Sequence, residues 1–421
     1  MKGYIRSWFS IKTNFQKIPK TQYTYLNNKQ LAIIKGKLII DGTPAIDLIQ
    51  KYRTPFFVFI EQRIRDNCQT ILNLSKKYFN SQIYYSYKAN YLTPICKIIA
   101  EEGLGAEIAT EYEYDIAIQN NINPKSIILS SPYKPASLLK KLITNGIGLI
   151  FICQIDEISE IAKYVEDEQV IDIGIRLRSP RPNKQIGISL DQNITHDIIE
   201  NLNKTKEFSL TTLQLHSGTQ IDDQLFKEGI NYLLNIANQF ESHGITVSQL
   251  DFGGGFPEAS SLSEEELENR FLLLFETLND RGWQKVICIF EPGRYIVADA
   301  GLLLTQIIQV FNVENTPWIM LNTGTHHCPK FSNSKFRFEL INRMSAPRNT
   351  STSIAGCLPT DMDVFTKRYP FPDNVKKGDY LAILNAGAYT FTWSTHFSYP
   401  YPPIILLNKD QIIPIKIPQV L

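Results

Sequence analysis

Between residues 82 and 294 the chain repeats one pattern, in which a short apolar run rich in β-branched residues precedes a longer amphipathic stretch. The apolar runs have the length of buried strands, and the stretches between them have helical spacing. We predict strands at residues 82–88, 105–109, 126–130, 148–154, 172–178, 210–216, 248–254 and 285–291. Strands that alternate with helices form parallel βαβ units.

The stretches between the strands carry helix signals. We predict helices at residues 93–103, 111–121, 135–146, 156–168, 223–244 and 263–282. Ser263 and Glu266 have the spacing of a capping box at the start of the last helix. Eight such units over roughly 210 residues favour a closed (β/α)8 TIM barrel. The alternative is an open doubly wound sheet, which needs a glycine-rich phosphate loop where this chain has YKANYLTP.

The pattern changes on both sides of this region. Short apolar runs precede residue 60, and after residue 301 such runs alternate with Gly, Pro and Asn turns. We therefore predict an N-terminal segment at residues 1–50, a barrel at 51–300 and a mostly antiparallel β domain at 301–421 that the N-terminal segment joins. The fold class is α/β plus β. Residues 1–20 lack the apolar core of a signal peptide, and we expect a poorly ordered or accessory lead-in.

Composition narrows the function classes. The chain has 421 residues, of which 43% are hydrophobic and 20% charged, as is typical of a globular protein. A net charge of +1 provides no electrostatic footprint for nucleic acid or an anionic membrane. No apolar run reaches the ~18 residues of a membrane span. The six cysteines are scattered without a C-x-x-C motif, which indicates a reduced, cytoplasmic protein.

Polar residues and glycines gather where the predicted strands end, which is the active-site face of a TIM barrel. They are Lys88, Glu107, Ser130, Gln154, Arg176, Arg178, His216, Gly253 to Gly255 and Glu291 to Arg294. Each residue alone is more typical of a solvated loop charge, a packing histidine or a flexible turn. Those interpretations do not require a common rim, so the shared placement predicts a functional site.

The chemistry of these residues suits one cofactor. A desolvated lysine such as Lys88 reacts with aldehydes. The glycine run 253–255 lets backbone N–H groups approach a phosphate, and Arg294 adds a charged donor. Glu291 can pair with a protonated ring nitrogen, and His216 can stack on a flat ring. Together these features predict a pyridoxal 5′-phosphate (PLP) site.

Several ordered motifs carry a family resemblance that runs from about residue 24 to residue 410. They are RTPFFVF (53–59), YSYKAN (85–90), HSGTQ (216–220), DFGGGFP (251–257), EPGRYIVADAG (291–301) and NAGAYTFTWSTHF (385–397). The chain resembles the alanine-racemase-fold PLP decarboxylases, the group of diaminopimelate and ornithine decarboxylases. The resemblance implies a homodimer with shared active sites and a small amino-acid substrate.

The resemblance also implies roles for individual residues. Lys88 matches the lysine that binds the cofactor covalently, His216 the histidine stacked on its ring, and Glu291 the acid on the ring nitrogen. The residues that match the phosphate-binding elements are Gly253, Gly254, Gly255, Gly293, Arg294 and Tyr389. Racemases of this fold carry an arginine in place of Glu291, so the glutamate favours decarboxylation.

One stretch departs from the family pattern G-P-x-C-x-x-x-D. This chain has GCLPTDMD at residues 356–363, where Asp363 aligns but Pro359 stands at the cysteine's position. Cys357 lies two residues early, which moves a side chain by roughly 6–7 Å along an extended chain. Two interpretations stay open: Cys357 reaches the site through a rearranged loop as a catalytic residue, or the cysteine's role is absent.

The expected substrate region also differs, because LNTGTHHCPKF (321–331) has no acid for a distal ammonium group. Its G-x-H-H pattern is similar to the subgroup that acts on modified or carrier-linked amino acids in siderophore and antibiotic pathways. The residues that we expect to contact substrate are Arg176, His326, His327, Thr360, Asp361 and Asp363. We expect no metal, because the adjacent residues His326, His327 and Cys328 do not easily converge on one ion.

The favoured function is thus PLP-dependent decarboxylation of a conjugated or modified amino acid, as in siderophore biosynthesis. Diaminopimelate decarboxylation is the alternative. A catalytically silent PLP-binding regulatory homologue is a further alternative, suggested by the displaced cysteine.

Overall fold

The computed structural model describes residues 11–12, 27–166, 168–190, 192–205, 207–329, 333–408 and 411–415. The lead-in predicted at residues 1–20 lies outside these residues, apart from positions 11 and 12. The chain divides into two compact units, which we call the barrel unit and the sheet unit. Of the described residues, those within Asn67–Pro257 and Leu262–Tyr295 form the barrel unit, and those before Asn67, within Glu258–Ser261 and after Tyr295 form the sheet unit.

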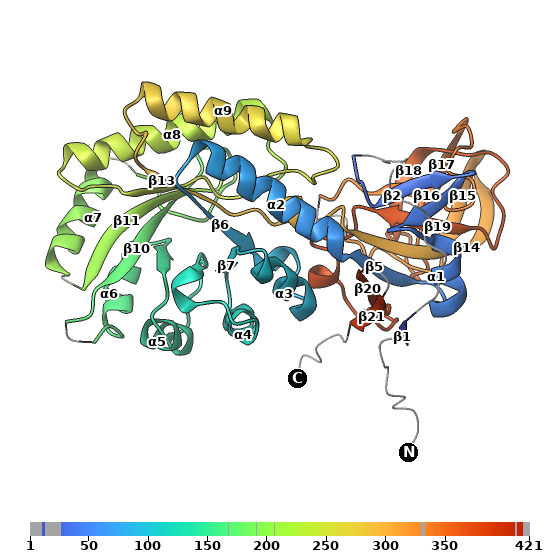
Figure 1. The fold of residues 1–421 in the computed structure, drawn as a ribbon, viewed down its shortest axis with the longest axis horizontal. Coiled ribbons are helices and arrows are strands. Elements are labelled where there is room, and N and C mark those ends of the chain that lie inside the picture. Colours follow the sequence, from blue (N-terminus) through green and yellow to red (C-terminus); the bar gives the residue numbers. More distant parts are fainter. Residues whose placement is uncertain are drawn as a thin grey trace, which may run out of the picture. The chain divides into compact units, whose positions relative to one another are not determined.

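Within the described residues, eight parallel strands of the barrel unit form a closed barrel (Figure 1). The strands are β6 (Ser81–Ser86), β7 (Gly105–Ile108), β8 (Ile127–Leu129), β9 (Leu149–Ile152), β10 (Ile171–Leu177), β11 (Phe208–Leu215), β12 (Gln249–Asp251) and β13 (Ile287–Phe290). β13 pairs with β6, which closes the ring. The predicted TIM barrel is confirmed, and the strands lie where the apolar runs placed them.

Helices connect the barrel strands. They are α2 (Glu61–Tyr78), α3 (Thr93–Glu101), α4 (Glu111–Gln119), α5 (Ala136–Thr144), α6 (Glu157–Ala162), α7 (Gln192–Lys204), α8 (Asp223–Ser242) and α9 (Glu264–Asp280). The sequence did not indicate α2 or α7. α6 ends before the predicted residue 168, because the amides of Tyr164 and Val165 bond the carbonyls three residues back and tighten the chain into turns.

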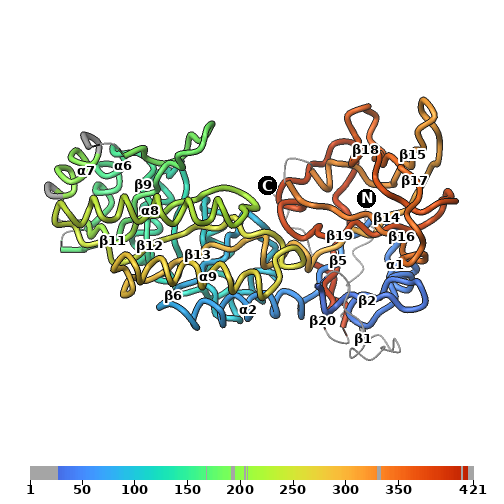
Figure 2. Tube along the Cα trace, turned by 90° about the horizontal axis from the view of Figure 1, so that it is seen from above, coloured from blue at the N-terminus to red at the C-terminus, as the bar shows by residue number. Residues whose placement is uncertain are grey.

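α8 and α9 lie side by side on the outside of the barrel in both views (Figures 1 and 2). The capping box at the start of α9 is present. Ser263 Oγ accepts from the Glu266 amide at 3.2 Å, and Glu266 Oε2 accepts from the Ser263 amide at 2.7 Å. Arg270 of α9 pairs with Asp223 of α8 at 2.7 Å.

The barrel interior is packed with side chains. Large rings from Tyr84 and Phe151 fill it, and each ring lies where a neighbouring strand has glycine. A Cβ on Gly105 would lie 2.5 Å from the Tyr84 ring, and one on Gly174 would lie 2.4 Å from the Phe151 ring. The centre therefore forms a solid floor, and polar side chains gather at the strand ends.

The sheet unit is mostly antiparallel. Its elements are β1 (Ile11–Lys12), β2 (Leu31–Ile34), β3 (Lys37–Ile40), β4 (Thr43–Pro44), α1 (Ala45–Tyr52), β5 (Phe56–Ile60), β14 (Gly301–Val313), β15 (Thr316–Leu321), β16 (Arg337–Leu340), β17 (Thr350–Ala355), β18 (Val364–Phe371), β19 (Tyr380–Leu384), β20 (Ile404–Asn408) and β21 (Gln411–Ile415). β14 pairs antiparallel with β5, β15 and β19, whereas β20 pairs parallel with β5 and β15 pairs parallel with β17.

The position of β5 differs from the prediction that the barrel begins at residue 51. The motif that contains it was expected at the start of the barrel, but β5 lies between β14 and β20 in the sheet. Its five side chains are buried, which suits a central strand. A short helix, α10 (Arg294–Val297), follows β13. Among the described residues, no helix combines the length and the apolar character that crossing a membrane requires.

Candidate active site

Lys88 lies in a single 3₁₀ turn, Tyr87–Ala89, directly after β6. Its ammonium pairs with Oε2 of Glu107 at the end of the adjacent strand β7, and the Ser86 hydroxyl donates to the same oxygen. The Lys88 side chain is 43% exposed, whereas that of Glu107 is 1% exposed. We expected burial to keep this amine neutral. The structure instead places it half-exposed at the rim, beside the Glu107 carboxylate.

A second carboxyl group, Glu113, lies behind this pair on α4. It is buried, and its Oε2 accepts a 2.6 Å hydrogen bond from the Ala109 amide. Burial and, to a smaller extent, the charge of Glu107 raise the pKa of Glu113 to about 7. The Glu113 carboxyl group therefore retains a proton up to near-neutral pH.

Glu291 follows β13 and is buried at the centre of the rim. Gln214, near the end of β11, donates from Nε2 to Glu291 Oε1 at 2.6 Å and to Asp251 Oδ2 at 3.3 Å. Burial is the main cause that raises the pKa of both carboxyl groups; the charge of Glu291 also raises the pKa of Asp251, and the charge of Glu107 also raises the pKa of Glu291. The side-chain amide of Gln214 thus donates hydrogen bonds to both Asp251 and Glu291. Both carboxyl groups retain protons more readily than free carboxyl groups do.

The same amide connects this pair to a cation. Ser130 Oγ donates to Gln214 Oε1 at 3.2 Å, and it accepts a 2.7 Å hydrogen bond from Arg176. A chain of hydrogen bonds therefore crosses the rim from β10 through β8 and β11 to Glu291. The sequence placed Arg176 and Ser130 at strand ends, but the role of Gln214 was missed because it lies two positions before His216, the predicted strand-end residue.

The glycine turn after β12 is tightly packed. Gly253 has φ +65°, and its amide donates to Asp251 Oδ1 at 2.7 Å. A Cβ at Gly254 would lie 2.4 Å from the carbonyl oxygen of Glu291. The turn needs glycine for its backbone conformation and for this close approach. The predicted residues Gly253, Gly254 and Gly255 thus lie directly beside Glu291.

His216 follows β11 at the rim. Burial, with a smaller contribution from the charges of Arg176, Lys88 and Lys184, lowers the pKa of His216 to about 3. The imidazole is therefore neutral at physiological pH. Gly293 and Arg294 are buried beside Glu291 in sequence, with Arg294 as the first residue of α10.

The remaining predicted residues lie in the sheet unit. Tyr389 adopts φ +56°, and its ring contacts Trp393 at a centroid distance of 6.2 Å. The rings of His326 and His327 are 3.6 Å apart. His327 Nδ1 lies 3.0 Å from the Thr323 hydroxyl, and both ring nitrogens of His326 are buried without a hydrogen-bond partner among the described residues.

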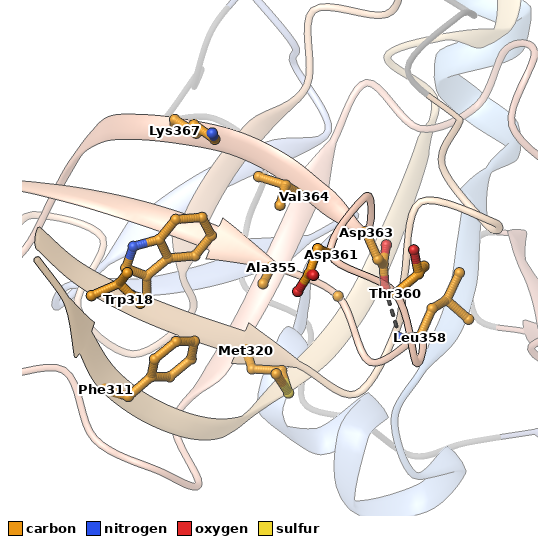
Figure 3. A pocket seen from close by; sticks show the side chains of 12 residues that line it. Phe311, Trp318, Met320, Ala355, Leu358, Thr360, Asp361, Asp363, Val364 and Lys367 are labelled. Carbon is orange, nitrogen blue, oxygen red and sulfur yellow. Dashed lines mark hydrogen bonds between the residues drawn. The ribbon is translucent and has the colours of Figure 1, made fainter.

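The loop of residues 356–363 encloses a cavity of 410 Å³ (Figure 3). Phe311 and Trp318 project from strands on one side, and Asp361 lies on the loop on the other. Buried Asp363 holds this loop together. Its carboxylate accepts from the Thr325 amide at 2.6 Å, the Thr325 hydroxyl at 2.9 Å and the Leu358 amide at 2.8 Å.

Cys357 lies in the same loop and is partly buried. Burial raises the pKa of the Cys357 thiol, and the Asp363 charge adds to the effect. The Tyr399 hydroxyl donates to the Cys357 carbonyl at 3.3 Å. The thiol therefore keeps its proton at neutral pH, which suits a proton donor better than a nucleophile. Its catalytic role stays a prediction, as do those of Thr360 and Asp361 in substrate binding.

The barrel rim fits PLP on its own chemistry. It combines an accessible amine at Lys88, a buried proton-holding acid at Glu291, a neutral imidazole and a glycine turn. Glu107 Oε1 is buried without a hydrogen-bond partner among the described residues, so the rim retains an unused acceptor. A metal site finds no such support, since the described residues contain no cluster of three or more His, Cys, Asp or Glu side chains suited to an ion.

Comparisons with known proteins agree with this chemistry. Residues 62–298 match the family described as pyridoxal-dependent decarboxylase, pyridoxal binding domain. The diaminopimelate decarboxylase of Methanothermobacter thermautotrophicus is 26% identical over 403 residues, covering 90% of this chain and 92% of that protein. The 2-[(L-alanin-3-ylcarbamoyl)methyl]-2-hydroxybutanedioate decarboxylase of Staphylococcus aureus is 27% identical over 365 residues, covering 79% and 89%.

A solved structure shares the fold. The crystal structure of diaminopimelate decarboxylase from Methanocaldococcus jannaschii superposes with a TM-score of 0.83 at 24% identity. The match covers 93% of this chain and 96% of that chain, so both units follow a known architecture.

Proposed function

We infer the reaction from one premise: the chain belongs to the family of pyridoxal-dependent decarboxylases. It is a PLP-dependent amino-acid decarboxylase. The reaction breaks the bond between Cα and the carboxylate, releases CO₂ and adds one proton to Cα. Bound PLP supplies the electron sink that accepts the pair left by CO₂. The observation that carries the assignment is the gathering of Lys88, Glu291 and His216 at one end of the barrel.

We assign the remaining binding and proton-transfer roles to individual residues. Lys88 would hold the cofactor through its amine, and the same amine could carry a proton. Glu291 holds a proton at the ring nitrogen, and Gln214 fixes its Oε1. His216 supplies a neutral, flat surface. The glycine turn and Arg294 would bind the phosphate, and the phosphate contact of Tyr389 stays an expectation from the family resemblance. Cys357 is the second candidate for the proton donor, because its raised pKa keeps the thiol protonated.

For the substrate, we propose an amino acid with a modified distal end, as in siderophore or other secondary-metabolite biosynthesis. The region expected to bind a distal ammonium group offers no acid. Asn322 stands there, and its amide is fully used within the sheet unit: it accepts from Thr305 Oγ1 at 2.7 Å and the Gln306 amide at 2.9 Å, and donates to Thr54 at 3.0 Å. The Staphylococcus aureus relative is named for such a conjugated substrate.

Diaminopimelate is the second candidate, favoured by the relative from Methanothermobacter thermautotrophicus, which covers 90% of this chain. The experiment is CO₂ release by the PLP-loaded protein from meso-diaminopimelate, L-lysine and 2-[(L-alanin-3-ylcarbamoyl)methyl]-2-hydroxybutanedioate. Release from the conjugate supports our proposal. Release from meso-diaminopimelate alone would reject it. A protein that binds PLP but releases CO₂ from none of them, nor from a wider panel of conjugates, would be the silent homologue.

We also propose a homodimer formed through the face of the sheet unit that carries the loop of residues 356–363. Met362 in the loop 356–363 is 85% exposed, and Val313, which lines the cavity of 410 Å³, is 45% exposed. Exposed apolar side chains around a groove are typical of an interface. Sedimentation should show a dimer that Met362→Glu weakens. Val170→Glu, which changes a 61% exposed valine of the barrel unit, is the matched control.

A further inference from the structure

A loop over the barrel rim carries positive charge without a compensating acid. Residues 178–187 leave the end of β10 and return to it. This segment and Arg176 contribute four cations, and no aspartate or glutamate occurs between residues 176 and 187. The cations are Arg176, Arg178, Arg181 and Lys184.

The base of this loop is fixed. The Arg178 amide donates to the Ile188 carbonyl at 2.8 Å, and the Ile188 amide donates to the Arg176 carbonyl at 2.8 Å. Arg178 Nε donates to the Gly187 carbonyl at 3.0 Å. Gly187 has φ +103°, and a Cβ there would lie 2.8 Å from the Arg176 carbonyl oxygen. These hydrogen bonds therefore fix the backbone at both ends of the loop.

The loop and the rim enclose a cavity of 200 Å³. It is lined by Arg176, Leu177, Ser179, Asn183, Lys184, Gln185, Ile186 and His216, with no carboxylate among them. Arg181 reaches the next strand end, where it donates to the Ser217 carbonyl at 3.4 Å. The volume is enough for a carboxylate with several waters, each of which occupies about 30 Å³.

The positive charges act on the site itself. Arg176 and Lys184 are two of the three cations that lower the pKa of His216. Arg176 uses one donor on Ser130, and a guanidinium has five. Lys184 is exposed and makes no hydrogen bond or ion pair with any residue that the structure describes. Donors thus remain that an anion entering the cavity can use.

We propose that this cavity binds an anionic group, a carboxylate at the distal end of the substrate, through Lys184 and Arg176. The inference rests on the proposed function and deepens it, because it gives the distal modification a charge. A cationic wall without a carboxylate attracts an anion and repels an ammonium, so the cavity selects acidic conjugates over diamines. The phosphate of the cofactor is the other source of the same chemistry, and the experiment separates the two.

Three ligands that differ only in the distal group provide the test. They are the succinyl amide, the acetyl amide and the free amine of L-2,3-diaminopropionate, which end in a carboxylate, a neutral methyl group and an ammonium. Dissociation constants come from the change that each ligand causes in the visible absorption of the PLP-loaded protein. We expect the succinyl amide to bind about 10-fold more tightly than the acetyl amide, and the preference to weaken with added salt.

Variants test whether the preference for the succinyl amide arises in this cavity. Lys184→Gln should remove the preference, and Lys184→Arg should keep it. Lys140→Gln, which changes an exposed lysine on α5, is the matched control and should leave it unchanged. Equal binding of the three ligands to the wild type would overturn the proposal. A Lys184→Gln variant that weakens PLP binding and keeps the ligand preference would also overturn it, because the cavity would then serve the cofactor phosphate.

Failure of the proposed function gives a different result. CO₂ release is measured in the same samples, so ligands that bind in the expected order without releasing CO₂ support the anionic site and count against the decarboxylase reaction on such conjugates. CO₂ release that is equal for the succinyl and acetyl amides in the wild type rejects the anionic site and leaves the reaction standing.

Discussion

The side-chain amide of Gln214 donates a 2.6 Å hydrogen bond to Oε1 of Glu291 inside the barrel, across a sequence separation of 77 residues. Gln214 is 0% exposed and Glu291 is 5% exposed, so no solvent replaces this contact if it is lost. The amide also reaches Asp251 and accepts from Ser130. Gln214 therefore fixes the orientation of the acid that faces the expected cofactor.

Gln214→Leu should disturb this orientation without changing the fold. A hydrogen bond to an ionisable group is worth about 1.5–3 kcal/mol, which corresponds to ~10–100-fold in rate. We expect that loss in kcat with little change in KM, together with a shifted pH titration of the visible absorption of bound PLP. Gln224→Leu, which removes an exposed amide that bonds Glu228 at 2.7 Å on α8, should change neither. An unaltered titration in Gln214→Leu would contradict the assigned role.

Lys88→Ala should remove the covalent attachment of the cofactor. Borohydride reduction followed by mass spectrometry should find PLP attached to the wild type and none on the variant. Activity should fall by roughly 10²–10⁴-fold, the range for loss of a proton-transfer group. Lys88→Arg is the informative control, because it keeps a cation beside Glu107 and cannot form the attachment. A PLP adduct recovered from either variant would show that another lysine holds the cofactor.

Glu113 gives stability a defined dependence on pH. Burial raises its pKa to about 7 in the folded protein, from 4.5 in the unfolded chain. The unfolded chain therefore releases this proton first as pH rises, so Glu113 lowers the free energy of unfolding progressively between about pH 4.5 and pH 7. Glu113→Gln should match the wild type below that window and exceed it above, by up to about 3 kcal/mol.

Urea unfolding at pH 5 and at pH 8 measures this difference. Glutamine can still accept from the Ala109 amide, so the comparison isolates the charge. Glu111→Gln, on the outer face of the same helix, should show no such gain. Equal pH slopes for the wild type and Glu113→Gln would exclude Glu113 as the group that titrates.

Asp363→Asn should destabilise the sheet unit, whereas Asp361→Asn should not. The Asp363 carboxylate is 3% exposed and accepts three hydrogen bonds from Thr325 and Leu358, while Asp361 is exposed. Losing a buried charged acceptor costs about 1–3 kcal/mol. Thermal unfolding measures this cost. Asp361→Asn tests the predicted substrate contact separately, since a higher KM at unchanged stability would support it and an unchanged KM would reject it.

Local sequence signals were sufficient for much of the fold. The alternation of apolar runs and helical stretches predicted the barrel strands, because burial on both faces makes a parallel strand apolar along its length. The capping box of Ser263 and Glu266 formed as predicted, because both partners lie within one helical turn. Lys88 and Glu291 were recognised because strand ends meet at one rim in any TIM barrel.

Tertiary structure decided which of these groups touch. Glu107 pairs with Lys88 across 19 residues, and Gln214 connects Ser130 and Glu291 across 84 and 77 residues. These partners meet only because the strands close into a ring with a particular register, which no local pattern encodes. The position of β5 between β14 and β20 has the same origin, because an apolar run specifies burial and not the neighbour it pairs with. The sequence by itself therefore determined the barrel, its eight strands, most of the helices between them and the chemistry at its rim. Closure of the barrel decided which residue holds each acid, which carboxylate faces the lysine and where the cationic cavity lies.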